Sequence, residues 1–228
     1  MIAMRDPLEL APLIDHTVLR PEATREDVER ACAEAREFGF AGVCVRLQHV
    51  ALAARALAGS RSRPISVVAF PSGTGGADAK VAEAREALAA GAQELDMVID
   101  LEALRRRDYA AVLRDVAAVV ECARPKGVKA ILETGALTRE EKVVAAALAK
   151  AAGAAFVKTS TGFGPGGATV DDVALLRSLV GADMGVKASG GIRSAADAWK
   201  MVDAGANRLG TSSSVAIVTG RTPDVRSY

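Results

Sequence analysis

Residues 155–191 read AFVKTSTGFGPGGATVDDVALLRSLVGADMGVKASGG and contain one strand–helix–strand unit. The apolar runs at 155–159 and 184–189 have the length of β-strands, and 170–180 has the spacing of an amphipathic helix. A strand, a helix and a second strand in this order are typical of a parallel sheet that is covered by helices.

The same alternation continues along the rest of the chain. It predicts an α/β fold, a single (β/α)₈ TIM barrel, although 228 residues is near the lower size limit of that fold. An open doubly wound sheet is the alternative, but no GxGxxG motif follows an early strand to support dinucleotide binding. The predicted strands are 13–15, 42–46, 65–70, 94–99, 128–133, 155–159, 184–189 and 208–211, and the predicted helices are 24–38, 48–58, 77–90, 108–123, 138–152, 170–180 and 194–204.

Residue types at the helix ends agree with these boundaries. Thr24, Thr138 and Ser194 each precede a helix and are followed three residues later by Asp or Glu, which is the pattern of an N-terminal cap. Glycine follows most of the helices, where a left-handed residue is common. No linker separates the elements, so residues 1–228 are expected to form one domain, with a flexible polar tail at 219–228.

Composition excludes several classes of protein. The chain is 50% hydrophobic and 25% charged, which rules out a wholly disordered protein. The net charge of +1 gives no electrostatic reason to bind nucleic acid or an anionic membrane. The N-terminus lacks the apolar run of a signal peptide, and no stretch approaches the roughly 20 apolar residues of a membrane span. With 3 scattered Cys and 2 His, we expect a cytoplasmic protein without a metal site.

Four charged residues interrupt apolar strands, where burying a charge is costly: Asp15, Asp96, Lys158 and Lys187. In such a barrel the catalytic groups lie at the carboxyl ends of the strands, so these four are candidate catalytic residues. For Lys158 taken alone, an ion pair with Glu133 is as good an explanation as catalysis.

Lys187 favours the catalytic interpretation of Lys158, because it occupies the equivalent position on the next predicted strand. Adjacent strands lie about 4.8 Å apart, so the two amino groups are expected to be close. Two neighbouring cations disfavour each other, and the pKa of one of them should fall. A neutral amine is the nucleophile that forms a Schiff base with a carbonyl substrate.

The other candidates allow two interpretations each. Asp96 could relay protons for one of the lysines or act as a plain ion-pair partner, and its apolar neighbours favour the functional role. Asp15 could belong to the site or cap a turn. Cys44 is more typical of a small buried hydrophobe than of a nucleophile.

Segments rich in glycine and hydroxyl groups, 161–164, 189–191 and 211–214, follow the last three predicted strands. Loops after strands 7 and 8 commonly hold phosphate in these barrels, and backbone N–H groups and hydroxyls can do so without a cationic patch. Glycine also serves ordinary turns. Three such loops on one rim nevertheless predict a phosphate-binding site.

Eight segments resemble the deoxyribose-phosphate aldolase family of class I aldolases, and together they cover almost the whole chain. The two that carry the lysines, GAAFVKTSTGFGPGGAT and VKASGGIR, are long and specific. The resemblance implies a lyase of deoxyribose phosphate catabolism that cleaves 2-deoxy-D-ribose 5-phosphate reversibly into acetaldehyde and D-glyceraldehyde 3-phosphate, with no metal or other cofactor. The other segments are LIDHTVLRPEAT, GVCV, AFPSG, GAQELDMVID, VKAILETGALT and AGANRLGTSS.

The resemblance also implies a role for each matching residue. Lys158 is similar to the Schiff-base lysine of the family, and Lys187 to the second lysine that lowers the pKa of the first. Asp96 is similar to the aspartate that works with Lys187 and a water in proton transfer. The positions similar to the phosphate-binding residues are Gly162, Gly190, Gly191, Ser212 and Ser213.

The sequence departs from the family pattern outside the lysine pair. Arg46-Leu47 stands where a polar or aromatic residue and a proline are common, and 72–80 is richer in glycine than usual. These departures concern the fit of the acceptor aldehyde. As a further hypothesis, the phenol of Tyr228 folds over the barrel mouth and assists proton transfer; a disordered tail is the alternative.

Two other functional classes remain as alternatives to an aldolase. A phosphosugar isomerase or synthase on the same barrel would use a carboxylate or histidine base and would not need two adjacent lysines. A phosphosugar sensor would need an output module, and no helix-turn-helix segment is left over. We expect small phosphorylated sugars and aldehydes as substrates and a homo-oligomer, dimeric or tetrameric.

Overall fold

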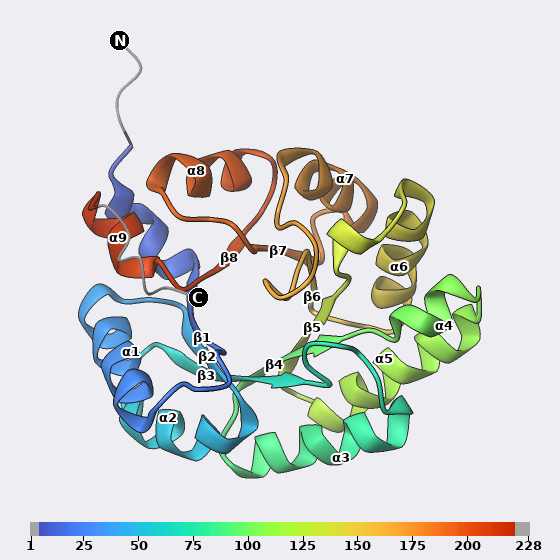
Figure 1. Cartoon of the computed structure of the whole chain (residues 1–228), viewed down its shortest axis with the longest axis horizontal. Coiled ribbons are helices and arrows are strands. Elements are labelled where there is room, and N and C mark those ends of the chain that lie inside the picture. Colours follow the sequence, from blue (N-terminus) through green and yellow to red (C-terminus); the bar gives the residue numbers. More distant parts are fainter. Residues whose placement is uncertain (1–4, 222–228) are drawn as a thin grey trace.

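A computed structural model of the chain describes residues 5–221. Eight parallel strands pair in sequence order, and β8 pairs with β1 to close the barrel (Figure 1). The prediction of a (β/α)₈ barrel is therefore confirmed. The strands are β1 (Ile14–Val18), β2 (Gly42–Val45), β3 (Arg63–Val68), β4 (Glu94–Val98), β5 (Gly127–Ile131), β6 (Phe156–Lys158), β7 (Gly185–Ser189) and β8 (Arg208–Thr211).

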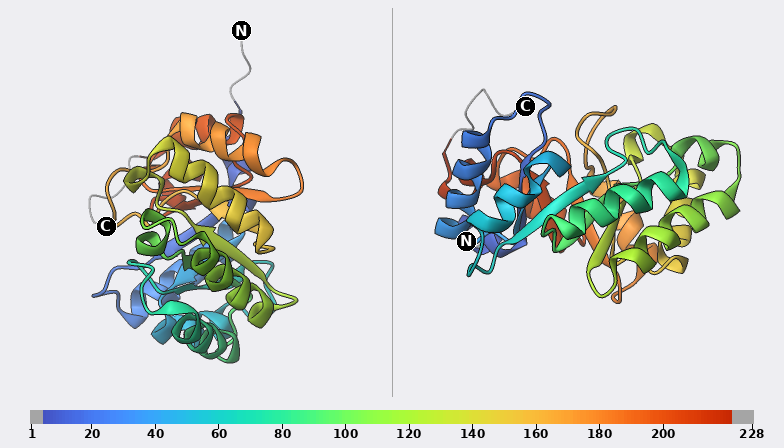
Figure 2. Two further views of the ribbon diagram at one scale, coloured as in Figure 1. Left: turned by 90° about the vertical axis from the view of Figure 1, so that its right-hand side faces the viewer. Right: turned by 90° about the horizontal axis from the view of Figure 1, so that it is seen from below.

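Helices cover the outside of the barrel as a ring, which Figure 2 shows from two further sides. All seven predicted helices are present, with ends that differ by at most two residues from the prediction. They are α1 (Arg25–Phe38), α2 (Val50–Ala56), α3 (Gly76–Ala89), α5 (Tyr109–Ala123), α6 (Arg139–Ala151), α7 (Val170–Val180) and α8 (Ala195–Asp203). No helix within residues 5–221 has the length and apolar character needed to cross a membrane.

Five shorter helical elements lie within residues 5–221, and four of them were not predicted because none is long enough to show helical periodicity. The fifth, η2, overlaps the start of the helix predicted at 48–58. Two are α-helical, and α9 follows β8 directly, at the edge of the predicted phosphate site. The five are η1 (Pro7–Leu13), η2 (Leu47–His49), η3 (Thr134–Ala136), α4 (Leu101–Arg105) and α9 (Ser214–Thr219).

The predicted caps fix the ends of the main helices. Thr24 and Thr138 each form a reciprocal capping box with the acidic residue three positions later. The hydroxyl of Ser194 accepts a hydrogen bond from the amide of Asp197 at 3.1 Å. Gly39 ends α1 in the left-handed conformation, with φ 73°. Local sequence thus determines where these helices begin and end.

Apolar side chains fill the space between barrel and helices, whereas much of the barrel interior is charged. Lys187 on β7 reaches both Asp15 on β1 and Asp96 on β4. Because these strands are not neighbours, their side chains can meet only inside the barrel. The interior therefore carries the polar groups of the site.

Candidate active site

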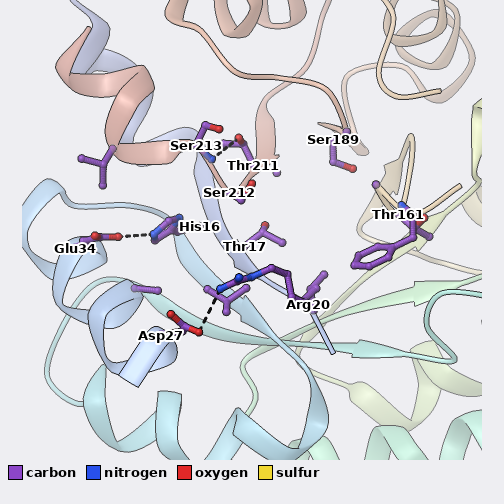
Figure 3. Close-up of a pocket in the computed structure, with 18 of the residues that line it drawn as sticks. His16, Thr17, Arg20, Asp27, Glu34, Thr161, Ser189, Thr211, Ser212 and Ser213 are labelled. Carbon is purple, nitrogen blue, oxygen red and sulfur yellow. Dashed lines mark hydrogen bonds and ion pairs between the residues drawn. The ribbon is translucent and has the colours of Figure 1, made fainter. Parts of the chain in front are cut away.

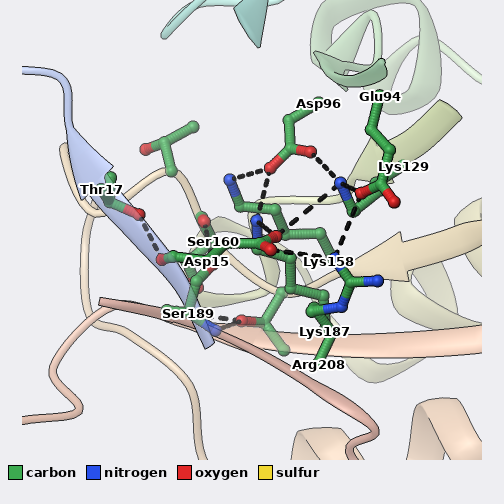
Figure 4. Close-up of polar contacts among 12 residues, drawn as sticks. Asp15, Thr17, Glu94, Asp96, Lys129, Lys158, Ser160, Lys187, Ser189 and Arg208 are labelled. Carbon is green, nitrogen blue, oxygen red and sulfur yellow. Dashed lines mark hydrogen bonds and ion pairs between the residues drawn. The ribbon is translucent and has the colours of Figure 1, made fainter. Parts of the chain in front are cut away.

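The two predicted lysines lie side by side on neighbouring strands. Lys158 on β6 is paired in register with Lys187 on β7. Their Nζ atoms both donate to Oδ2 of Asp96, at 2.9 and 2.8 Å (Figure 4). Side chains from β4, β6 and β7 thus converge. Each is a charged residue within an apolar strand, the feature that marked them as candidates in the sequence.

Asp96 is the shared partner of three cations. Its Oδ1 accepts from Nζ of Lys129 on β5 at 2.8 Å, while Oδ2 faces Lys158 and Lys187. Burial favours the neutral acid, but the three ammonium groups outweigh it and hold the pKa of Asp96 well below its ordinary value. Asp96 is therefore an anion that separates and orders the lysines.

Lys187 is the permanently charged member of the lysine pair. Burial favours its neutral form, yet the carboxylates of Asp15, at 2.5 Å, and Asp96 raise the pKa of Lys187 above its ordinary value. The predicted fall in pKa therefore does not occur at Lys187. A fall in pKa was predicted from repulsion between the two amines alone. In the structure Lys187 also pairs with two carboxylates, which stabilise its charged form.

The positively and negatively charged side chains of the barrel interior differ in number. Four basic groups face three carboxylates, so the fully ionised set carries one positive charge in excess. Lys158 forms one ion pair among the described residues, with Asp96, whereas Lys187 forms two and Lys129 three. Lys158 therefore has the fewest anionic partners of the three lysines. The seven groups are Asp15, Glu94, Asp96, Lys129, Lys158, Lys187 and Arg208.

Three members of this set were not predicted. Lys129 and Glu94 lie 2.6 Å apart, and Arg208 contacts Glu94 and Asp15 at 3.2 and 2.9 Å. Lys129 carries the same signal as the predicted residues, a charge within an apolar strand. Glu94 and Arg208 gave no comparable signal because each begins its strand.

Glu133 does not pair with Lys158, which corrects that alternative. Its backbone is left-handed, with φ 55°, and its buried carboxylate turns to the loop after β6. There it accepts a 2.5 Å hydrogen bond from the hydroxyl of Thr161, and the Thr161 amide donates to both of its oxygens at 3.3 Å. Gly164 packs against the same carboxylate, which leaves no room for a side chain. Glu133 thus shapes a loop of the rim.

A cavity of about 750 Å³, part of whose lining is drawn in Figure 3, opens beside Lys158. Of the seven interior charged groups, only Lys158 lines it. Four of the predicted phosphate-binding residues also line it, whereas Gly191 does not. The side-chain oxygens of Ser212 and Ser213 are buried and have no hydrogen-bond partner among the described residues. Two residues of the cavity wall therefore carry hydroxyl oxygens without a hydrogen-bond partner. The four residues are Gly162, Gly190, Ser212 and Ser213.

Arg46, where the sequence departs from the family pattern, lies against a residue of the cavity wall. Its Nε donates to the carbonyl of Leu19 at 2.7 Å, and its guanidinium carbon lies 5.6 Å from the ring centre of Phe70 and 6.0 Å from that of Phe163. The two rings meet edge to face, and Phe163 lines the cavity. Arg46 therefore supports one wall of the cavity and does not touch the lysines.

Cys44 behaves as a buried hydrophobe, as its sequence context suggested. It packs with Leu19, Ile65 and Val67, and burial raises the pKa of its thiol to about 11. Tyr228 and most of the 219–228 tail lie outside the described residues. Within residues 5–221, no three His, Cys, Asp or Glu side chains are grouped so that they could hold a metal ion.

The buried ion pairs predict a loss of stability in acid. Burial favours neutral Asp15, but Lys187, Lys129 and Arg208 outweigh it and lower the pKa of Asp15 to about 2. A carboxyl with a depressed pKa contributes stability that is present above about pH 4 and lost as the pH falls towards 2. Lys187, whose pKa is raised, contributes stability with the opposite pH dependence. Its contribution is complete below about pH 10 and is lost as the pH rises above that value.

The variant Asp15→Asn tests this dependence. Urea unfolding followed from about pH 7 to about pH 3 should show a less stable variant at neutral pH and a shallower decline in acid than the wild type. Asp183→Asn, which changes an exposed carboxyl, is the control and should keep the wild-type slope. Equal acid slopes in Asp15→Asn and the wild type would contradict the prediction.

Comparisons with known proteins agree with this geometry. The family model described as DeoC/LacD family aldolase matches residues 10–221. The deoxyribose-phosphate aldolase of Clostridium perfringens (strain SM101 / Type A) is 50% identical over 220 residues, which are 96% of this chain and 98% of the relative. That of Thermococcus gammatolerans is 54% identical over 217 residues, 93% of this chain and 96% of the relative.

Solved structures give the same result. A putative deoxyribose-phosphate aldolase from Coccidioides immitis superposes with a TM-score of 0.92 and 42% identity, over 95% of this chain and 87% of that one. Deoxyribose phosphate aldolase from Aeropyrum pernix, described as a unique tetrameric structure, gives a TM-score of 0.85 and 38% identity, over 94% and 91% of the two chains. By sequence and by structure, the chain belongs to the DeoC/LacD family of aldolases.

Proposed function

We propose that this protein cleaves 2-deoxy-D-ribose 5-phosphate reversibly into acetaldehyde and D-glyceraldehyde 3-phosphate through a Schiff base on Lys158. The observation that carries the proposal is the position of Lys158, the one amine of the charged interior that lines the cavity, beside the charged Lys187 and Asp96. The relatives that are about half identical over almost the whole chain support the same reaction.

The first half of the cleavage is imine formation. The neutral amine of Lys158 attacks the aldehyde carbon of the open-chain sugar, and loss of water leaves an iminium ion. The iminium accepts the electron pair of the C2–C3 bond as that bond breaks. The C3 hydroxyl loses its proton and becomes the aldehyde of D-glyceraldehyde 3-phosphate, and an enamine of acetaldehyde remains on Lys158.

Asp96 and Lys187 supply the proton transfers of the second half. The enamine carbon takes up a proton, and water then hydrolyses the resulting iminium to acetaldehyde and free Lys158. Both groups lie within 3 Å of each other and reach Lys158 through Oδ2 of Asp96. A water held between them and the substrate would carry the proton, and synthesis runs through the same steps in reverse.

The rim after β6, β7 and β8 would hold the phosphate. Gly190 and Gly191 have φ values of 90° and 79°, a conformation that exposes backbone N–H groups without a side chain in the way. Ser212 and Ser213 contribute the unpartnered hydroxyls. A phosphate anchored away from the reacting carbons lets its binding energy position the C2–C3 bond at Lys158.

Borohydride trapping tests the proposal directly. Reduction converts an imine of acetaldehyde into a stable ethyl group, and peptide mass mapping then identifies the modified lysine. We expect one ethyl group, on Lys158, and less of it when the sugar phosphate is added first. An adduct on Lys187 would reverse the roles of the two lysines, and a folded protein without any adduct would exclude Schiff-base chemistry.

We also propose a homo-oligomer in the cytoplasm. The tetrameric assembly described for the Aeropyrum pernix relative supports the oligomer, and the metabolic substrate supports the location. Light scattering coupled to size-exclusion chromatography measures the assembly, and a mass of one chain would contradict it.

A further inference from the structure

We propose that His16 is a positioning residue for the phosphate-binding turn after β8, which it holds in place through Ser214. The inference rests on the proposed function, because it assumes that this turn receives the substrate phosphate. His16 follows Asp15 in β1, and the proposed reaction steps use neither its ring nor its hydrogen bonds.

His16 points away from the charged interior. Successive residues of a strand face opposite sides, so Asp15 turns to Lys187 inside the barrel while His16 turns towards α1 and α9. Its Nε2 lies 2.7 Å from Oε2 of Glu34 on α1 (Figure 3), and its Nδ1 lies 2.8 Å from Oγ of Ser214, the first residue of α9. His16 is 6% exposed and Ser214 is fully buried, so the contact between them is shielded from solvent.

The hydrogen-bond partners define the chain of contacts. The Glu34 carboxylate only accepts, which assigns the hydrogen on Nε2 to the histidine. The Ser214 hydroxyl has a single hydrogen, so with Nδ1 as an acceptor this hydrogen is shared between Nδ1, at 2.8 Å, and the carbonyl oxygen of Thr211, at 3.1 Å. A continuous series of polar contacts therefore runs from Glu34 through His16 and Ser214 to the end of β8.

The segment held in this way is the phosphate-binding turn. The hydroxyl of Thr211 accepts from the amide of Ser213 at 3.0 Å and donates to the carbonyl of Ile192 at 2.7 Å. Ser212 and Ser213, whose hydroxyls have no partner among the described residues, lie between the two points that Thr211 and Ser214 fix. Moving Ser214 would therefore move the groups that face the phosphate.

The effect expected from this arrangement is specific to phosphate. His16, Glu34 and Ser214 make no hydrogen bond or ion pair to Lys158, Lys187 or Asp96 among the contacts of the described residues. Their loss should therefore weaken binding of the phosphorylated sugar and leave the steps at the imine unchanged. A role in packing alone would impair all substrates equally.

The variants Glu34→Gln and Ser214→Ala test the proposal at the two ends of the chain of contacts, together with His16→Asn. For 2-deoxyribose 5-phosphate we expect KM to rise about tenfold, the effect of one lost buried hydrogen bond, with kcat changed less than about twofold. For unphosphorylated 2-deoxyribose, kcat/KM should stay within about twofold of the wild type. Ser178→Ala, on the exposed face of α7, is the matched serine control and should match the wild type throughout.

Competition by inorganic phosphate provides a second measurement. Its inhibition constant should rise in the three variants in proportion to KM. Glu34 is 29% exposed, so Glu34→Gln keeps the test available if His16→Asn does not fold. Equal losses for the phosphorylated and unphosphorylated sugars, or no change in phosphate inhibition, would overturn the inference. An effect of His16→Asn alone would also overturn it, because a direct contact with substrate does not need Glu34 or Ser214.

Borohydride trapping separates this inference from the proposed function. All three variants should still form the ethyl adduct on Lys158 with acetaldehyde, which carries no phosphate. Failure of trapping in the wild type would contradict the Schiff-base reaction itself. Normal trapping with unchanged KM values in the variants would contradict only the role of His16.

Discussion

Replacing Lys158 with arginine is expected to reduce kcat/KM for 2-deoxyribose 5-phosphate by about four orders of magnitude or more. Arginine keeps the positive charge and can still pair with Asp96, but it remains protonated and forms no imine with an aldehyde. The change therefore removes the nucleophile and retains much of the electrostatics. Steady-state kinetics and borohydride trapping measure the two consequences separately.

The control for this variant is Lys200→Arg, which makes the same substitution on the exposed side of α8. It should retain wild-type activity and the adduct on Lys158. If Lys158→Arg kept activity within about a factor of ten of the wild type, the assigned nucleophile would be wrong, because residual catalysis by binding alone is much smaller than that.

Asp96→Asn is expected to separate imine formation from proton transfer. General acid–base groups contribute about 10²–10⁴-fold to rate, so kcat should fall within that range. The variant removes the negative charge shared by Lys129, Lys158 and Lys187, and breaking buried ion pairs of this kind costs about 3–5 kcal/mol of stability. In deuterated buffer, exchange of the methyl protons of acetaldehyde should fall with kcat in the folded variant, while trapping on Lys158 remains.

Glu94→Gln is the control for Asp96→Asn, because Glu94 belongs to the same group of interior charged residues. Glu94 contacts Lys129 at 2.6 Å and makes no ion pair with Lys158 or Lys187 among residues 5–221. Its loss should lower stability and leave methyl exchange much closer to the wild type than Asp96→Asn does. Equal loss of exchange in both variants would show that net charge matters and that the position of Asp96 does not.

The fold and the lysine pair could be predicted because both depend on patterns that are local in the chain. Strand and helix periodicity located the main elements, and the capping residues Thr24 and Thr138 located helix ends. Lys158 and Lys187 could be recognised as neighbours because each is the fourth residue of an apolar strand, and the two strands follow each other in the chain.

The remaining parts of the site depend on closure of the barrel, which no local pattern encodes. Asp15 and Arg208 are 193 positions apart, and His16 and Ser214 are 198 apart, yet both pairs are in contact. The short helix α9 and the left-handed backbone of Glu133 are likewise set by tertiary contacts. Sequence reasoning therefore found the residues with unusual chemistry and missed the contacts that tune them.

Closure of the barrel also determines when, during synthesis on the ribosome, the chemistry can start. Asp15 is translated early, whereas Lys187 follows 172 positions later. A nascent polypeptide that has not yet released β7 and β8 carries Lys158 without Lys187, and Asp15 without Lys187 and Arg208. The imine-forming site is therefore assembled only after the last strands have emerged from the ribosome.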